Sequence, residues 1–199
     1  DQPHQEEVMA KLEGFQWENS QLRGDHYKEN FFAVERMLAF FEVEPKDKIV
    51  QDLINTFEGV KFRLQFRGEK DGLNFFNDSK STNLESTMTA LKCFSGEEVI
   101  LILGGSKRSD YLDLDAIKIF KNIKKIFAIG DAATEVNEQL KGSFLVDMKK
   151  GLVDVFQSLE KENANLVFSP AYPSFDQYDN YIARGEHFDK LVEEFLLLN

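Results

Sequence analysis

Cysteine, histidine and proline are scarce in this sequence, which has one cysteine, three histidines and four prolines among its 199 residues. The single cysteine, Cys93, excludes an internal disulfide and any cysteine-rich metal site. The histidines, His4, His26 and His187, are too scattered along the chain to suggest a metal-ligand motif. We therefore expect this chain alone to hold no metal.

Long apolar runs and dense basic clusters are also missing. The longest apolar stretches, such as Val99 to Leu103, are far too short to cross a bilayer, and the N-terminal DQPHQEEV lacks the apolar segment of a signal peptide. The formal charge is −11, and no group of lysines and arginines is dense enough to follow a phosphate backbone. We therefore expect neither nucleic acid nor membrane as a partner, and a cytoplasmic location.

Two regions with different apolar periodicity follow one another along the chain. It begins at Asp1 without an initiator methionine, in sequence that reads as structured, so we expect it to be a fragment of a larger protein. Helical spacing extends from Glu29 to Val43, and a second helical pattern ends at Gly59. The period then changes, which predicts a short helical tail over residues 1–58 and a separate domain over residues 59–199.

Short, almost purely hydrophobic runs alternate with amphipathic segments in the second region. The predicted strands are Leu73 to Phe76, Val99 to Leu103, Lys125 to Ile129, Phe144 to Val146 and Leu166 to Phe168. The predicted helices are Leu84 to Cys93, Asp115 to Phe120, Ala132 to Leu140, Leu152 to Leu159 and Gln177 to Leu198. Such alternation indicates the α/β class, with a Rossmann-like, mostly parallel sheet and helices on both faces.

Three unusual polar loops follow predicted strands. They are NDSKSTN (Asn77 to Asn83), GGSKRSD (Gly104 to Asp110) and SPAYPSFDQ (Ser169 to Gln177). Ligands of such folds bind at the carboxyl ends of the strands, so we expect the loops to lie together. Each loop also precedes a predicted helix, whose first turn presents unpaired N–H groups, so the expected ligand is an anion.

Helix capping is the alternative explanation for the first and third loops. Asn83 or Thr82 would cap the helix after NDSKSTN, and a serine or aspartate would cap a helix predicted to begin near Asp176. Capping leaves Asp78 and Lys80 without a role, which favours a functional site in the first loop.

The second loop has no G-x-x-x-x-G-K spacing and is therefore weak as a nucleotide motif. Its two glycines indicate either a flexible turn that brings Lys107 or Arg108 to the shared crevice, or a solvated loop whose charges have no ligand. The sequence leaves both possibilities open.

Together these loops resemble the C-terminal domain of the Mur ligase family, most closely that of the members that add D-glutamate. NDSKSTN is nearly the NDSKATN signature of those enzymes. SPAYPSFDQYDNYIARGEHF, residues 169–188, is similar to their pattern SPA-x-x-S-x-DQF-x-x-F-x-x-RG-x-x-F. Upstream, LRGDHYKENFFAV resembles the G-[DE]-HN-x-x-N motif that closes the family's central domain.

The resemblance implies an ATP-dependent ligase of peptidoglycan precursor synthesis. In that family ATP, with Mg²⁺, phosphorylates the carboxylate of UDP-N-acetylmuramoyl-L-alanine, and the amine of D-glutamate attacks the acyl phosphate. Residues 1–58 would be the C-terminal end of the central ATP-binding domain, and residues 59–199 the amino-acid-binding domain. The family's P-loop, magnesium ligands and UDP-binding domain have no counterpart here. We therefore expect this chain alone to fold, to bind D-glutamate at most weakly and to hydrolyse no ATP.

Transferred by position, the resemblance places two groups of donors around the two carboxylates of D-glutamate. Thr82 and either Lys107 or Arg108 would hold the α-carboxylate, whereas Lys80, Ser174 and the backbone at Tyr181 would hold the side-chain carboxylate. The expected D-glutamate-binding residues are Thr82, Lys107, Arg108, Ser174, Phe175 and Tyr181. Lys80 and Asp78 are the expected catalytic residues, and Asp78 and Arg63 are expected on the ATP side.

Two residues depart from the family pattern. Phe62 replaces the histidine of a PHR motif, and Tyr27 replaces an asparagine that contacts adenine. These changes leave open a non-catalytic binding module that has kept the amino-acid site. A further alternative is a different acceptor, as in the diaminopimelate- or lysine-adding relatives or folylpolyglutamate synthase, although the DNPR sequence of the diaminopimelate-adding type is missing.

Overall fold

The computed structural model describes residue 23, residues 25–41 and residues 47–198. It divides into two compact units, Asp1–Gly59 and Val60–Asn199. The helices described in the first unit are α2 (Asp25–Phe40) and α3 (Asp47–Thr56). The helical pattern predicted up to Val43 is confirmed as far as Phe40, and residues 1–22, predicted to be structured, lie outside the described residues.

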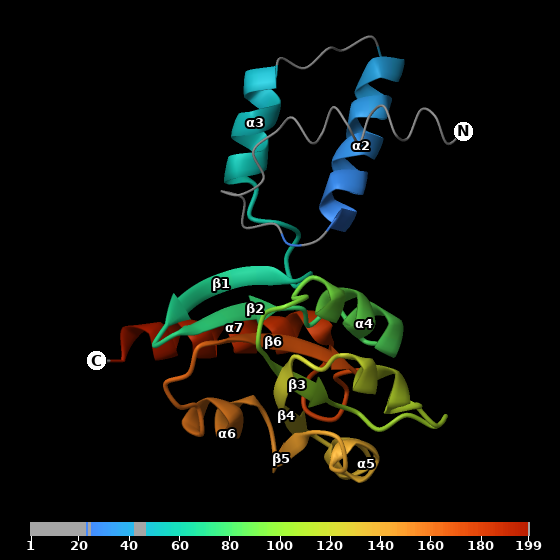
Figure 1. Ribbon diagram of the computed structural model, residues 1–199, viewed down its shortest axis with the longest axis vertical. Coiled ribbons are helices and arrows are strands. Elements are labelled where there is room, and N and C mark those ends of the chain that lie inside the picture. The colour runs from blue at the N-terminus through green and yellow to red at the C-terminus, as the bar shows by residue number, and fades with distance from the viewer. Residues whose placement is uncertain (1–22, 24, 42–46, 199) are drawn as a thin grey trace. The chain divides into compact units, whose positions relative to one another are not determined.

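The second unit is built on one six-stranded sheet of strand order β1-β2-β6-β3-β4-β5, which can be followed in Figure 1. Its strands are β1 (Gln65–Lys70), β2 (Leu73–Asn77), β3 (Val99–Gly104), β4 (Ile123–Ile129), β5 (Leu145–Lys149) and β6 (Ala164–Ala171). Its helices are α4 (Leu84–Lys92), the 3-10 helix η1 (Leu114–Ile119), α5 (Ala133–Leu140), α6 (Leu152–Gln157) and α7 (Tyr181–Leu197). Only β1 and β2 pair antiparallel among these strands, so the predicted mostly parallel α/β sheet is confirmed.

Both faces of the sheet are covered, which explains why the central strands are apolar throughout. All six residues of β3 are buried. Leu101 and Leu103 pack in one cluster with residues of α4, η1 and α5, while Ile100 and Ile102 pack in another with residues of α6 and α7. Side chains alternate between the two faces along a strand, so one apolar run supplies both cores. None of the helices in the described ranges has the length and apolarity needed to span a membrane.

The edge strand β1 was not among the predicted strands. Its sequence, QFRGEK, is largely polar, because an edge strand has few neighbours to bury it. It joins β2 through Asp71 and Gly72, which both have positive φ, 55° and 88°. An Asp-Gly pair is a strong hairpin signal, so this turn is the sequence feature from which the strand could have been predicted.

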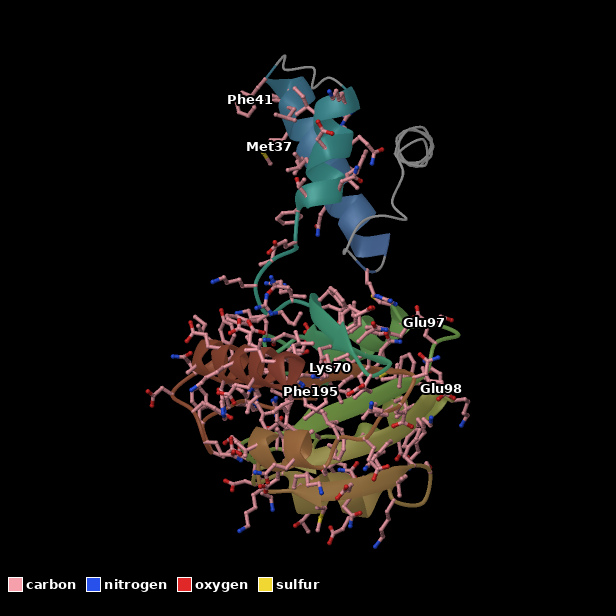
Figure 2. All side chains as sticks on the ribbon, turned by 90° about the vertical axis from the view of Figure 1, so that its left-hand side faces the viewer. Met37, Phe41, Lys70, Glu97, Glu98 and Phe195 are labelled. Carbon is pink, nitrogen blue, oxygen red and sulfur yellow. The ribbon has the colours of Figure 1, made fainter. Side chains whose placement is uncertain are left out.

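Lys70 fastens β1 to the C-terminal end of α7. Its Nζ donates to the carbonyl oxygens of Phe195 at 3.0 Å and Leu196 at 3.2 Å, and also to that of Leu198. Figure 2 shows Lys70 beside Phe195. The last carbonyls of a helix have no intrahelical donor, and a cation at this end also interacts favourably with the negative end of the helix dipole.

Two predicted helices differ from the structure. The segment from Asp115 to Phe120 forms the 3-10 helix η1 rather than an α-helix. The prediction that the last helix begins near Asp176 is wrong, because α7 begins at Tyr181. The side chain of Asn180 accepts hydrogen bonds from two backbone N–H groups of the first turn, at 2.9 and 3.0 Å, and so provides the cap.

The two cores predict a contrast between two isoleucines. Ile126 of β4 is fully buried, whereas Ile119 of η1 is 64% exposed. We expect Ile126→Ala to lower the free energy of unfolding by about 2–5 kcal/mol, because it removes transfer energy and leaves a cavity. Ile119→Ala should change it by less than about 0.5 kcal/mol. Urea denaturation checks both values, and equal losses would contradict the assigned burial.

Candidate functional site

The three polar loops meet at the carboxyl ends of β2, β6 and β3, which are neighbours in the sheet. The N–H of Asp78 donates to the carbonyl of Phe168 at 2.8 Å, which joins the first loop to β6. The N–H of Ser106 donates to the carbonyl of Pro173 at 2.8 Å, which joins the second loop to the third. The predicted convergence of the loops is therefore confirmed.

Asp78 lies inside this convergence as a buried acceptor, with 5% of its surface exposed. Its carboxylate accepts hydrogen bonds from Leu64 N at 3.0 Å, Ser81 Oγ at 2.6 Å and Ser169 Oγ at 2.7 Å. Burial raises the pKa of the Asp78 carboxyl from 3.8 to about 6, and the three donors and the nearby charge of Arg63 oppose this shift. The carboxyl group is thus held by its own domain.

The segment that enters the second unit is bound to the first loop. Phe62 and Leu64 have positive φ, 63° and 46°, a backbone region that residues with a Cβ seldom adopt. Lys80 N donates to the carbonyl of Phe62 at 3.1 Å, and Leu64 N donates to Asp78. The Phe62 ring lies so close to Gly185 that a Cβ there would be 2.4 Å from Phe62 Cδ1. Phe62, the departure from the PHR motif, is therefore a buried packing residue of this domain.

Lys80 and Tyr181, which the resemblance assigns to one site, lie together in the structure. Lys80 Nζ is 4.0 Å from the centroid of the Tyr181 ring, which is a cation–π contact. Between the two loops, Ser79 Oγ donates to the carbonyl of Tyr181 at 2.9 Å. Tyr181 is the first residue of α7, so the first loop is bonded directly to the start of that helix.

Capping accounts for one residue of the first loop. Asn83 is the N-cap of α4, and its side chain accepts a hydrogen bond from Ser86 N at 2.9 Å, as predicted. Thr82 is half-buried beside it, and its N–H donates to the carbonyl of Lys80 at 2.9 Å. The cap therefore explains Asn83 and leaves the side chains of Lys80 and Thr82 for other roles.

The paired glycines of the second loop are required by close packing. Gly104 and Gly105 have positive φ, 124° and 145°. A Cβ on Gly104 would lie 2.2 Å from the carbonyl oxygen of Ile129, and one on Gly105 would lie 2.3 Å from that of Pro173. Neighbouring backbone encloses both positions, which accounts for the two glycines; that the turn brings Lys107 or Arg108 to the crevice stays a prediction.

The basic residues of the second loop lie further out. Lys107 is exposed, and Arg108 forms a two-bond ion pair with Asp110, with Nε–Oδ1 at 3.1 Å and Nη2–Oδ2 at 3.2 Å. The loop does not lead directly into a helix, because η1 begins at Leu114. The side chains of Lys107 and Arg108 are thus presented on the outer part of the loop.

The third loop begins within β6, which continues through Ala171. Ser174 is 2% exposed, and its carbonyl accepts hydrogen bonds from Gln177 N at 3.2 Å and Tyr178 N at 2.9 Å. Phe175, the next residue, is 72% exposed. Ser174 is therefore built into a turn, whereas Phe175 is open to a partner or ligand.

The Asp-Gln pair of the third loop binds it to the residues that follow β4 and β5. Asp176 Oδ2 accepts a hydrogen bond from Asp131 N, just after β4, at 3.3 Å. Gln177 Nε2 donates to the carbonyl of Lys150, just after β5, at 2.7 Å. Sequence reasoning considered the aspartate only as a helix cap and assigned Gln177 no role, although both stand in the motif that carries the resemblance.

Arg184 was also missed, and it is the charged residue that these loops surround. It is 1% exposed. Its guanidinium donates from Nε to Ser79 Oγ at 3.1 Å, from Nη2 to Ser79 O at 2.9 Å and from Nη1 to Tyr172 O at 3.0 Å. Burial lowers the pKa of Arg184 to about 10. Arg184 precedes Phe188 by four residues, so both side chains lie on the buried face of α7. This spacing is the sequence signal that could have identified Arg184 as buried.

Other expected positions can be described only in part. Arg63 is exposed, and its charge acts on Asp78. Tyr27 lies in α2, but its side chain is outside the described part of the structure. Within the ranges that are described, no three His, Cys, Asp or Glu side chains are grouped so that they could hold a metal ion.

The raised pKa of Asp78 predicts an unusual pH dependence. The folded protein binds this proton more tightly than the unfolded chain, so the contribution of Asp78 to stability rises as pH falls from about 6 to about 4. The expected gain is on the order of 3 kcal/mol. It should appear as a difference between wild type and Asp78→Asn in urea denaturation at several pH values, and parallel stability curves for the two proteins would refute it.

The close approach at Gly104 predicts a steric penalty. We expect Gly104→Ala to lower the free energy of unfolding by at least about 1 kcal/mol, because the new Cβ meets backbone and the residue keeps a positive φ. Gly142→Ala is the matched control, since nothing lies within 4 Å of its added Cβ. Thermal denaturation of both variants is the measurement, and a neutral Gly104→Ala would show that this loop is not tightly packed.

Comparison with known proteins finds sequence relatives of this chain. No protein-family profile matches the chain. The chain is 35% identical over 192 residues to the UDP-N-acetylmuramoylalanine–D-glutamate ligase of Petrotoga mobilis, a match that covers 94% of this chain and 43% of that protein. The chain therefore spans less than half the length of this relative.

Solved structures share the fold at low sequence identity. Folylpolyglutamate synthase from Thermotoga maritima matches with a TM-score of 0.61 and 16% identity, over 89% of this chain and 42% of that one. The MurF ligase from Thermotoga maritima, solved in complex with ADP, matches with a TM-score of 0.50 and 14% identity, over 83% of this chain and 38% of that one. Over nearly its whole length the chain is therefore similar in sequence to part of a D-glutamate-adding ligase, and it shares its fold with a folylpolyglutamate synthase and a MurF ligase.

Proposed function

We propose that this chain is the amino-acid-binding part of an ATP-dependent ligase of peptidoglycan precursor synthesis, acting in the cytoplasm. The ligase joins D-glutamate to UDP-N-acetylmuramoyl-L-alanine. The observation that carries this proposal is the contact of Lys80 with Tyr181, because it joins the first loop to the start of α7, two segments whose sequences resemble the motifs of the D-glutamate ligases. ATP, Mg²⁺ and the UDP-linked substrate are then held mainly by parts of the ligase that precede residue 59.

In this proposal the side-chain carboxylate of D-glutamate binds between the first and third loops. Lys80 supplies a full positive charge, and its contact with the Tyr181 ring restricts the rotamers of a long side chain. The first turn of α7 at Tyr181 adds partial positive charge from its backbone. Ser174 supplies a hydroxyl from the turn that precedes this helix.

The α-carboxylate binds on the side of the second loop. Thr82 supplies a hydroxyl, and Lys107 or Arg108 supplies a charge. Arg108 must leave Asp110 to reach the ligand, but an exposed ion pair contributes only about 0–1 kcal/mol, so a carboxylate of the substrate can replace it. With both carboxylates held, the amine is left as the nucleophile, and fixing its position lowers the barrier to attack.

Asp78 acts on the ATP side through the segment that it holds. ATP would supply the activation of the UDP-N-acetylmuramoyl-L-alanine carboxylate as an acyl phosphate, with ADP as the product. The amine of D-glutamate then displaces phosphate from that carbonyl carbon. Asp78 binds Leu64 N, and this bond fixes the backbone beside Arg63, whose exposed side chain then faces the nucleotide. Lys80, two residues from Asp78, lies between the nucleotide side and the amino-acid side and is the residue that we expect to contact the reacting groups.

Phosphate release by the full-length protein tests this function. The reaction contains ATP, Mg²⁺, UDP-N-acetylmuramoyl-L-alanine and one acceptor: D-glutamate, L-glutamate or diaminopimelate. We expect release with D-glutamate, and a loss of kcat/KM of roughly a hundredfold in Lys80→Ala, because a charged partner of a carboxylate is removed. Lys92→Ala, which removes an exposed lysine at the end of α4, is the matched control and should keep full activity.

The acceptors separate the competing functions. Release with diaminopimelate instead of D-glutamate would assign the protein to another branch of the family. No release with any acceptor, from a folded full-length protein, would identify a non-catalytic module that binds an amino acid. Equal losses in Lys80→Ala and Lys92→Ala would remove Lys80 from the site.

A further inference from the structure

Arg184 is buried where all three loops meet. Its guanidinium bonds Ser79 of the first loop and Tyr172 of the third. It also lies against the second loop, because a Cβ on Gly105 would be 3.0 Å from Arg184 Nη1. A single side chain from α7 therefore touches each segment that the proposed site requires.

Among the residues that the structure describes, no carboxylate lies within ion-pair distance of the Arg184 guanidinium, and the carboxylate whose charge acts on it is that of Asp176 in the third loop. The acceptors of its guanidinium are a hydroxyl and two carbonyl oxygens, and Phe168 lies under it, with the ring centroid 5.7 Å from Cζ. Burying an ionised group costs free energy, and neutral acceptors offset only part of that cost. A positive charge kept in such a place strengthens the binding of an anion near it, because the interior screens charge weakly.

The hydrogen bonds of Arg184 also pass through Ser79 to the expected substrate contacts. Ser79 Oγ accepts from Arg184 Nε and donates to the carbonyl of Tyr181. Ser79 directly precedes Lys80, whose Nζ lies over the Tyr181 ring. A shift of Ser79 would therefore move both Lys80 and the bond to the first turn of α7.

We propose that Arg184 is a positioning residue for the amino-acid substrate: its guanidinium sets the spacing of the three loops, and its charge favours a dicarboxylate bound by them. Arg184 does not touch the substrate in this role. The inference rests on the proposed function in one respect, namely that the dicarboxylate is D-glutamate.

Three substitutions in the full-length protein test this role. Arg184→Gln removes the charge and the fork of donors, whereas Arg184→Lys keeps the charge and loses the fork. Leu140→Ala is the control for lost stability, because Leu140 is fully buried at the end of α5 away from the carboxyl edge of the sheet. We expect Arg184→Gln to raise the KM for D-glutamate by about tenfold or more and the KM for ATP by less than about twofold.

The control and the conservative variant separate positioning from stability. Leu140→Ala should lower the melting temperature and leave the KM for D-glutamate unchanged. Arg184→Lys should recover part of the affinity through its charge. An unchanged KM in Arg184→Gln, or the same rise in Leu140→Ala, would overturn the proposal. If Arg184→Gln does not fold, Ser79→Ala removes the bridging hydroxyl and should raise the same KM by a smaller factor.

Hydrogen exchange makes the test independent of the proposed substrate. The N–H of Ser106 joins the second loop to the third through Pro173 O, and the N–H of Lys80 joins the first loop to the entering segment through Phe62 O. They should exchange faster in Arg184→Gln and not in Leu140→Ala. If the wild-type protein does not use D-glutamate while this difference is present, the proposed function fails and the positioning role stands. If exchange at both groups is unchanged, the positioning role fails.

Discussion

The parallel pairing of β6 with both β2 and β3 is the constraint on which the rest of the structure depends. It places the carboxyl ends of three strands side by side, although the segments that follow them are far apart in the chain. Ser169 and Asp78, separated by 91 positions, come within 2.7 Å through this pairing. The loops then need only short extensions to meet, and helices on both faces keep the strands in register.

Two buried ionisable groups at this edge lower the stability of the fold but fix the geometry of the loops. Asp78 and Arg184 are each almost completely buried, and each is held mainly by neutral groups. Burial raises the pKa of Asp78 and lowers that of Arg184, so both charged forms cost free energy. An apolar pair would be less costly there. What these two separate side chains provide instead is directed hydrogen bonding: Asp78 binds the segment entering the domain, and Arg184 binds the loops.

Much of the fold followed from periodicity, and much of the proposed site from loop composition. The apolar runs predicted β2, β3, β4 and β6, because strands buried on both faces carry no polar alternation. The polar loops after them predicted where the strands end. The start of α7 was misplaced, since Ser174 and Asp176 look like caps but have other partners, whereas Asn180 provides the cap. Which of several candidate residues caps a helix depends on the local backbone geometry, and the sequence does not give that geometry.

The sequence by itself determined the fold class and the resemblance to the Mur ligases, because apolar periodicity and motifs can be identified from the residues alone. Only the tertiary structure decided what Asp78, Gly104, Phe62 and Arg184 do. Their roles are defined mainly by partners 12 to 105 positions away in the sequence, or by backbone that approaches within van der Waals distance. Such contacts exist only after the parallel strands have paired, so no local pattern in the chain announces them.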